Sequence, residues 1–287
     1  TPSSWHGVTT TVFGNCGVGF APVRPGASGY LINLMEGVED IPGTALAEGM
    51  SWDWETFPEY MDALEKLPRT VDVACHVPHG AVRAYVMGER GARNEPATAE
   101  DIAEMSRIVG EGVAAGALGF STSRTMLHLA KDGEPVPGTF AAEDELLGIG
   151  RAMGAAGHGV FEMASDMAPA EDEFAWMKAM SAETGVPVTY GLLQSPTKAD
   201  NWKRMLALTE EARAEGAQIT AQIACRPTGM VLGWQSTVHP FIGRESYRKL
   251  AALPFAERIV HLRDPDVRAR ILSEPSKPLG AIGMLLP

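Results

Sequence analysis

The 287 residues of this chain are 45% hydrophobic and 21% charged, which is ordinary for a globular protein with a sizeable core. Acidic residues outnumber basic ones by 36 to 24, and the net charge of −12 argues against nucleic acid and anionic membranes as partners. No apolar run approaches the roughly 20 residues that a membrane-spanning helix needs. The three cysteines, Cys16, Cys75 and Cys225, are odd in number and widely spaced. This excludes a disulfide framework and suits a reducing compartment, so we expect a cytoplasmic protein.

The first strand signal is the β-branched and aromatic run of residues 9–13, whose composition is typical of a strand buried on both faces. Glycines follow at positions 14, 17 and 19, and Cys16 lies between the first two. Catalytic groups of α/β barrels lie at the carboxyl ends of parallel strands, so Cys16 is a candidate site residue. The alternative is that Cys16 is a small core residue.

Residues 23–55 contain many turn residues and few periodic signals, so we expect a long loop there. Trp52 and Trp54 in this loop either wall a substrate pocket or belong to the core. Beyond it, strand and helix signals alternate. We expect helices at 56–67, from the cap at Thr98 through Val113, at 143–153, 174–180 and 200–214, and strands at 71–77, 117–122, 159–163, 186–192 and 218–224.

Strands that alternate with helices indicate a parallel sheet with right-handed crossovers. About six such units are present, whereas a closed barrel of this kind needs eight. The predicted fold class is therefore α/β, an incomplete (β/α)8 barrel that spans residues 1–274. Residues 275–287 form an apolar C-terminal tail.

Five short motifs resemble those of the N-acyl-D-amino-acid deacylases (D-aminoacylases) of the amidohydrolase superfamily. They are WHGVTT at 5–10, GNCG at 14–17, HGAVR at 79–83, MG at 87–88 and GALGFST at 116–122. The resemblance implies a metal-dependent hydrolase barrel, and it places the start of this chain just before the family's second strand. On that basis we expect a fragment that lacks the first and last barrel strands.

The resemblance also implies one or two zinc or other divalent ions, with Cys16 as a ligand. Glu162 stands where the family would place a histidine. A carboxylate is an acceptable ligand for zinc, so Glu162 is either a second metal ligand or a salt-bridged carboxylate at the barrel mouth. His76 and His79 are three residues apart on an expected strand and would point to opposite faces, so we do not expect them to bind one metal ion.

Six residues are candidates for binding the substrate, and no catalytic residue is assigned. His79 and Arg83 match the family's His-Gly-x-x-Arg segment, and Arg124 closes the strand at 117–122. Three further candidates lie near the carboxyl ends of the last two predicted strands. Amide and guanidinium groups are suited to holding a carboxylate or carbonyl, and these three are Gln194, Gln222 and Arg226.

Together these observations predict a metal-dependent amidohydrolase that cleaves a non-peptide amide bond of a small molecule. The resemblance implies an N-acyl-D-amino acid as the substrate. The alternative is a barrel that has lost catalysis and binds a small carboxylated ligand. Because a catalytic zinc needs about three protein ligands and only Cys16 and Glu162 can be named, we expect this chain alone to be inactive.

Overall fold

The structure is a computed structural model that describes residues 2–39, 41–167, 169–194, 199–224, 232–235 and 239–277. Contacts divide the chain into two compact units. The first, which we call the sheet unit, comprises Thr1–Leu192 and Arg204–Gln222, and the second comprises Leu193–Lys203 and Ile223–Pro287. The domain boundary expected at residue 274 stays a prediction, and residues 278–287 of the expected tail lie outside the described residues.

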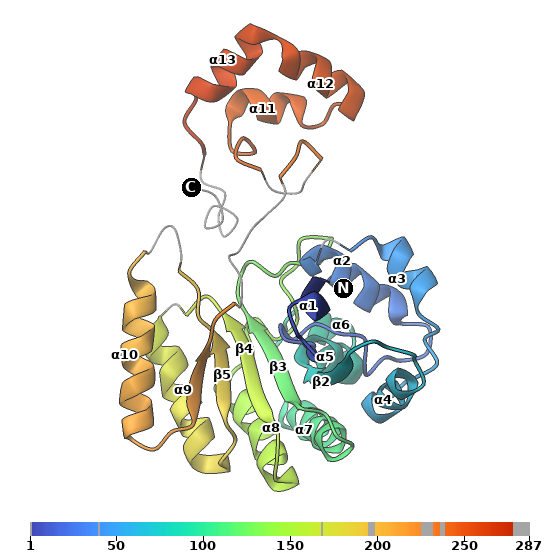
Figure 1. Ribbon diagram of the computed structural model, residues 1–287, viewed down its shortest axis with the longest axis vertical. Helices are drawn as coiled ribbons and strands as arrows, with labels where there is room; N and C mark the ends of the chain where they lie inside the picture. The colour runs from blue at the N-terminus through green and yellow to red at the C-terminus, as the bar shows by residue number, and fades with distance from the viewer. Residues whose placement is uncertain are drawn as a thin grey trace. The chain divides into compact units, whose positions relative to one another are not determined.

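The sheet unit is built on a parallel sheet in which each strand pairs with the next strand along the chain (Figure 1). The strands are β1 (Thr10–Phe13), β2 (Asp72–Pro78), β3 (Gly119–Arg124), β4 (Val160–Ser165), β5 (Val188–Gly191) and β6 (Ile219–Gln222). All five pairings are parallel. The prediction of about six parallel strands is therefore confirmed.

Helices connect the strands, and the later ones pack behind the sheet in the view of Figure 1. They are α1 (Pro2–Trp5), α2 (Ser28–Glu39), α3 (Gly43–Gly49), α4 (Phe57–Glu65), α5 (His79–Met87), α6 (Glu89–Ala92), α7 (Ala99–Ala114), α8 (Glu143–Ala156), α9 (Ala170–Thr184) and α10 (Asn201–Ala214). Every strand-to-strand connection runs through at least one of them, as parallel pairing requires.

Local sequence explains where several helices begin. The Thr98 side chain accepts the Asp101 N–H and the Asp101 carboxylate accepts the Thr98 N–H, which forms a capping box at the start of α7. Met105, Val109 and Val113 recur on one face of this helix and are fully buried. The cap predicted at Thr98 is confirmed.

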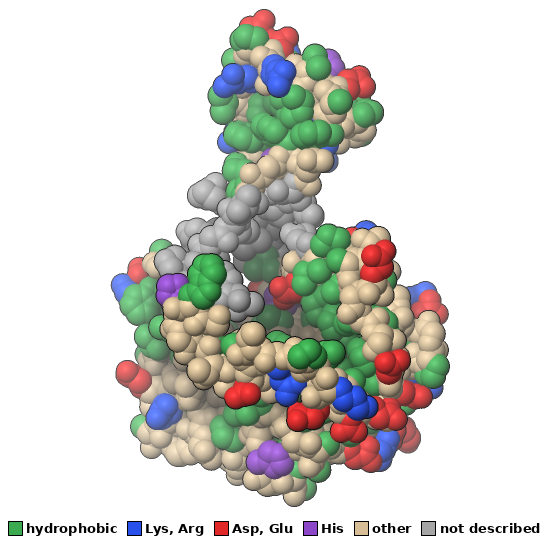
Figure 2. Space-filling view, turned by 45° about the vertical axis from the view of Figure 1, so that its right-hand side comes forward, with side chains coloured by type: hydrophobic (Ala, Val, Ile, Leu, Met, Phe, Trp, Pro, Cys, Tyr) green, Lys and Arg blue, Asp and Glu red, His purple; other side chains and the backbone are tan. Residues whose placement is uncertain are grey.

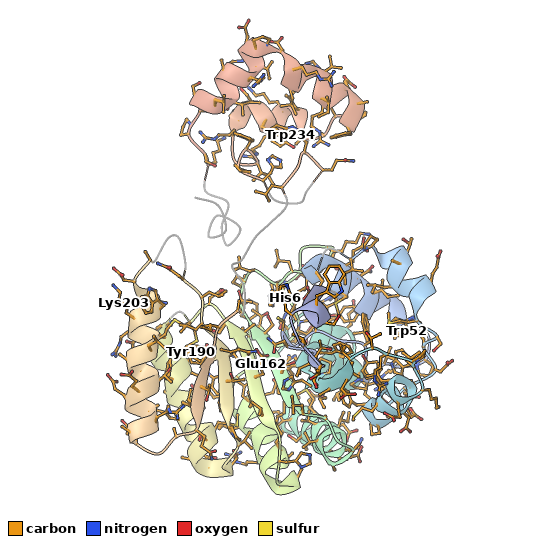
Figure 3. All side chains as sticks on the ribbon, in the orientation of Figure 1. His6, Trp52, Glu162, Tyr190, Lys203 and Trp234 are labelled. Atoms are coloured by element: carbon orange, nitrogen blue, oxygen red, sulfur yellow. The ribbon has the colours of Figure 1, made fainter. Side chains whose placement is uncertain are left out.

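The two faces of the sheet differ in character. Phe120, Phe161 and Tyr190 point toward the helices and are fully buried. Strand residues alternate between faces, so Glu162 and its register partner Thr189 point the other way, to what we call the open face. Figure 3 shows Glu162 in the middle of the sheet. The core of this unit therefore lies between sheet and helices, and polar side chains occupy the open face.

Two expectations were wrong. The run at 9–13 is not buried on both faces, since Val12 and Phe13 of β1 are 43% and 40% exposed. Among the described residues β1 pairs only with β2, and a strand at a sheet edge leaves one side uncovered. The expected loop at 23–55 contains α2 and α3. Leu31 and Leu34 of α2 are buried in small clusters, so tertiary packing stabilises a helix that local periodicity did not reveal.

The second unit is helical, with α11 (Glu245–Leu250), α12 (Phe255–Arg263) and α13 (Pro265–Ser273). Its small core consists of Tyr247, Leu262 and Ile271.

In the described part of the chain, no helix combines the length and apolar character that crossing a membrane requires. Figure 2 shows acidic and basic side chains interspersed on the visible surface, in keeping with exposed ion pairs such as that of Arg107 with Glu104.

Candidate active site

The loop of residues 14–19, which we call the Cys16 loop, follows β1 and lies against the ends of β2 and β3. Gly14 and Gly17 have positive φ angles of 75° and 70°, a conformation that glycine adopts without a steric cost. A Cβ on Gly17 would lie 2.8 Å from both the Ser123 nitrogen and the Thr122 Cα. Because residue 17 is glycine, the loop can pack directly against the backbone of β3.

Ser121 on β3 contacts this loop on both sides of the cysteine. Its Oγ donates to the Gly14 carbonyl and accepts the Gly17 N–H at 3.1 Å. The position of Cys16 is therefore fixed by a strand more than a hundred residues further along the chain.

Glu162 lies on the open face of β4 and is only 1% exposed. Its Oε2 has no hydrogen-bond partner among the described residues. Burial disfavours the carboxylate and raises the pKa of Glu162 to about 9. No ion pair to Glu162 is found within the described ranges, so the salt-bridge alternative lacks support, and an unpartnered buried oxygen is left facing the open side of the sheet.

A cavity of about 350 Å³ lies on the open face beside Glu162. Its polar lining comes from four strands and the Cys16 loop: Asn15, His76, Glu162, Thr189, Thr220 and Gln222. His76 is 5% exposed, its Nδ1 has no hydrogen-bond partner in the part of the chain that the structure describes, and burial lowers its pKa to about 4. A neutral imidazole and an unpaired carboxyl therefore line one cavity.

Sequence analysis did not select His76 as a site residue. The alternation of side chains between the two faces of a strand could have identified His76. His76 lies on the open face two residues before Pro78, whose register partner on β3 is Ser121, itself paired with Glu162. His79, by contrast, is the first residue of α5 and faces the helix layer, so the two histidines lie on different sides, as expected.

The Cys16 thiol is strongly disposed to stay protonated. Burial raises its pKa to about 12, and the nearby Glu162 and Glu39 carboxylates act in the same direction. Cys16 also borders a larger cavity of about 680 Å³, where its neighbours include Met35, Trp54 and Tyr60. The described residues that line the two cavities include no Lys or Arg.

The described residues contain no group of three or more His, Cys, Asp or Glu side chains arranged to hold a metal ion. Cys16 and Glu162 are the two predicted ligands, and they lie close enough for the Glu162 charge to act on the thiol. Their donor types suit a divalent cation, and within the described ranges no protein group bonds to the Glu162 Oε2. The two residues therefore fit a metal site in part, and a full set needs further ligands.

His79 and Arg83 lie in the helix layer, and both contact Glu145 of α8. His79 Nε2 lies 2.7 Å from Glu145 Oε1, and its Nδ1 lies 2.8 Å from Thr122 Oγ1. Arg83 donates to both Glu145 oxygens and to the Glu95 carbonyl. The side chains of His79, Arg83 and Glu145 are at most 2% exposed. This geometry suits a structural network, and substrate binding by His79 and Arg83 stays a prediction.

The other predicted substrate residues are scattered. Arg124 donates to Glu173 at 3.0 Å and to the Ala141 carbonyl, whereas Gln222 lines the cavity beside Glu162. Gln194 belongs to the second unit and donates to the Ala199 carbonyl at 3.2 Å. Arg226 lies outside the described residues. Of the substrate candidates that the structure describes, only Gln222 lines the cavity beside Glu162.

The parallel strands and connecting helices form part of a hydrolase-type barrel, and the chain belongs to the amidohydrolase family, which it matches over residues 1–280. A D-aminoacylase of Alcaligenes xylosoxydans xylosoxydans is 38% identical over 122 residues, which are 42% of this chain and 22% of that protein. The N-acyl-D-glutamate deacylase of the same organism is 28% identical over 86% of this chain and 49% of its own length.

A solved structure of D-aminoacylase, concerned with the functional role of its binuclear metal centre, is also similar. It matches with a TM-score of 0.57 at 28% identity, over 77% of this chain and 42% of that one. The prediction of an incomplete amidohydrolase-type barrel is therefore confirmed. The chain spans about a fifth of the length of the D-aminoacylase relative and about half of the length of the N-acyl-D-glutamate deacylase.

Proposed function

We propose that the protein carrying this chain is a metal-dependent amidohydrolase that cleaves the amide C–N bond of an N-acyl-D-amino acid or a related small amide. Membership of the amidohydrolase family supports the reaction class. The D-aminoacylase and N-acyl-D-glutamate deacylase relatives support the substrate class. Zinc is the proposed metal, in keeping with the thiol of Cys16 as a ligand.

The observation that carries this proposal is the buried Glu162 oxygen that has no partner among the described residues, on a side chain close enough to Cys16 for its charge to act on the thiol. A carboxyl group without a partner is costly to bury, and such groups occur where a ligand completes them. Cys16 and Glu162 would hold the cation together with further ligands of the whole protein. When bound, a divalent cation polarises the scissile carbonyl and lowers the pKa of water.

The residues of this chain have distinct parts in that reaction. Cys16 and Glu162 must both lose their protons when the cation binds, because only the thiolate and carboxylate are ligands. Burial lowers the pKa of His76 to about 4, so at pH 7 it is a neutral imidazole that can accept a hydrogen bond at the wall of the cavity. Gln222 offers an amide donor to a substrate carbonyl or carboxylate in the same cavity.

The test uses the whole protein, metal analysis and turnover of N-acetyl-D-amino acids, with the L-enantiomers as the control substrates. Cys16→Ala should reduce both zinc content and turnover, since a methyl group cannot replace a thiolate ligand. The matched control is Cys75→Ala, which removes the other free cysteine among the described residues. If Cys16→Ala keeps full zinc and full turnover while the enzyme stays folded, the proposal is wrong.

A further inference from the structure

The hydroxyl of Ser121 forms hydrogen bonds to the backbone on both sides of Cys16. It donates to the carbonyl two residues before the cysteine, at Gly14, and accepts the N–H one residue after it, at Gly17. A serine hydroxyl has one proton and two lone pairs, so a single side chain can make both bonds. Ser121 is fully buried on β3, which leaves it no exchange with solvent.

Backbone contacts assist the hydroxyl without replacing it. The Gly80 N–H donates to the Gly17 carbonyl at 2.9 Å, and Gly17 approaches the backbone of Thr122 and Ser123. Both of these contacts lie on the C-terminal side of Cys16. The bond to Gly14 extends the attachment to the N-terminal side, so Ser121 is the side chain that ties both flanks of the cysteine to one strand.

Ser121 also determines where the Cys16 loop lies relative to Glu162. The two residues are register partners on the adjacent strands β3 and β4, and they point to the same face. Backbone hydrogen bonds between β3 and β4 therefore fix Glu162 relative to Ser121, and the Ser121 hydroxyl fixes Cys16 relative to both.

We infer that Ser121 is a positioning residue that holds the Cys16 thiol at the place where it and Glu162 can bind one divalent cation. The inference rests on the proposed function, in which both residues are metal ligands. Ser121 is not a nucleophile in this arrangement, because its proton and one lone pair are engaged by the loop it holds.

The test compares Ser121→Ala with Ser123→Ala in the whole protein. Ser123 is a matched control, since it is on the same strand and face, is equally buried, and bonds to His128 Nδ1 at 2.9 Å instead of to the Cys16 loop. Two quantities are measured: zinc affinity by chelator competition, and the rate at which iodoacetamide alkylates Cys16 in the chelated, folded protein, read from the mass of the Cys16 peptide.

Ser121→Ala should weaken zinc binding and speed alkylation of Cys16, each by about tenfold, because two hydrogen bonds that fix the loop are lost. Ser123→Ala should change neither quantity. Ser121→Gly removes the same hydroxyl and adds neither a zinc ligand nor a thiol that iodoacetamide could alkylate, so it serves as the second variant and should change both quantities in the same direction.

Two results would overturn the inference. One is a Ser121 variant that matches Ser123→Ala in both quantities. The other is faster alkylation with unchanged zinc affinity, which would make Ser121 a loop anchor without a role in metal binding. Failure of the proposed function is distinguishable from both, because it would show as full zinc content in Cys16→Ala.

Discussion

The Nε2 atom of His79 lies 2.7 Å from Glu145 Oε1, and Arg83 donates to the same carboxylate. With the proton on Nε2, the Thr122 hydroxyl donates to Nδ1, and every nitrogen of the imidazole is satisfied. A carboxylate held by a guanidinium and an imidazole ties α5 to α8 behind the sheet, although Arg83 and Glu145 are 62 residues apart in sequence.

Glu145→Ala should destabilise the protein by about 3–5 kcal/mol, because it leaves a buried guanidinium without its partner. The measurement is urea unfolding. Glu104→Ala is the control, since Glu104 pairs with the exposed Arg107 and should cost at most about 1 kcal/mol. Unchanged stability of Glu145→Ala together with an increased KM would instead favour the predicted role of His79 and Arg83 in substrate binding.

Acid should destabilise the protein through the same three residues. Burial alone would raise the pKa of Glu145, but bonding to His79 and Arg83 holds it well below its ordinary 4.5. A lowered folded-state pKa gives stabilisation that is present above pH 4.5 and is lost as the pH falls toward the folded value. The pKa of His79 is lowered by burial and by the charges of Arg83 and Arg124.

In the unfolded chain, His79 takes up a proton below its ordinary pKa of 6.5, whereas in the folded protein its lowered pKa keeps it neutral. Because the unfolded state then binds more protons, acid again favours unfolding. Unfolding free energies measured from pH 7 down to about pH 3.5 should therefore decrease, and Glu145→Gln should flatten the part below pH 4.5. An equally steep decrease in Glu145→Gln would assign the acid sensitivity to other groups.

Gly17→Ala should cost about 2 kcal/mol or more. The substitution adds a Cβ 2.8 Å from the backbone of β3, at a φ of 70° that side chains rarely adopt. Gly29→Ala, in α2, is the control, because a Cβ there meets nothing within 4 Å. It should change stability by no more than about 1 kcal/mol. Denaturant unfolding of both variants checks this, and equal stabilities would mean that the Cys16 loop is not seated on β3 as described.

Glu162→Gln should separate stability from metal binding. In the chelated protein it should leave stability unchanged or increase it, because a neutral amide replaces a carboxyl that is buried with an unpartnered oxygen. Zinc affinity of the whole protein should decrease, since an amide is a poorer ligand than a carboxylate. Glu173→Gln, which disrupts the pair with Arg124, should do the opposite: lower stability and unchanged zinc affinity. Unchanged zinc affinity in Glu162→Gln would remove Glu162 from the metal site.

Much of the local structure follows from the sequence alone, because the interactions that determine it span only a few residues. The capping box of Thr98 and Asp101 starts α7, and the apolar face from Met105 to Val113 orients it. Alternation of such helices with short β-branched runs was enough to predict a parallel sheet. The position of Cys16 just after β1 could be predicted for the same reason.

The roles of the polar side chains were decided by tertiary structure. His79, Arg83 and Arg124 follow strands, as site residues do, yet their partners are carboxylates on α8 and α9 that no local pattern links to them. The protonation states of Glu162 and His76 depend on their surroundings in the folded protein. Both side chains are buried on one face of the sheet, and each has a polar atom without a hydrogen-bond partner among the described residues. Sequence periodicity determines which residues share a face, whereas burial and pairing depend on which distant segments pack against that face.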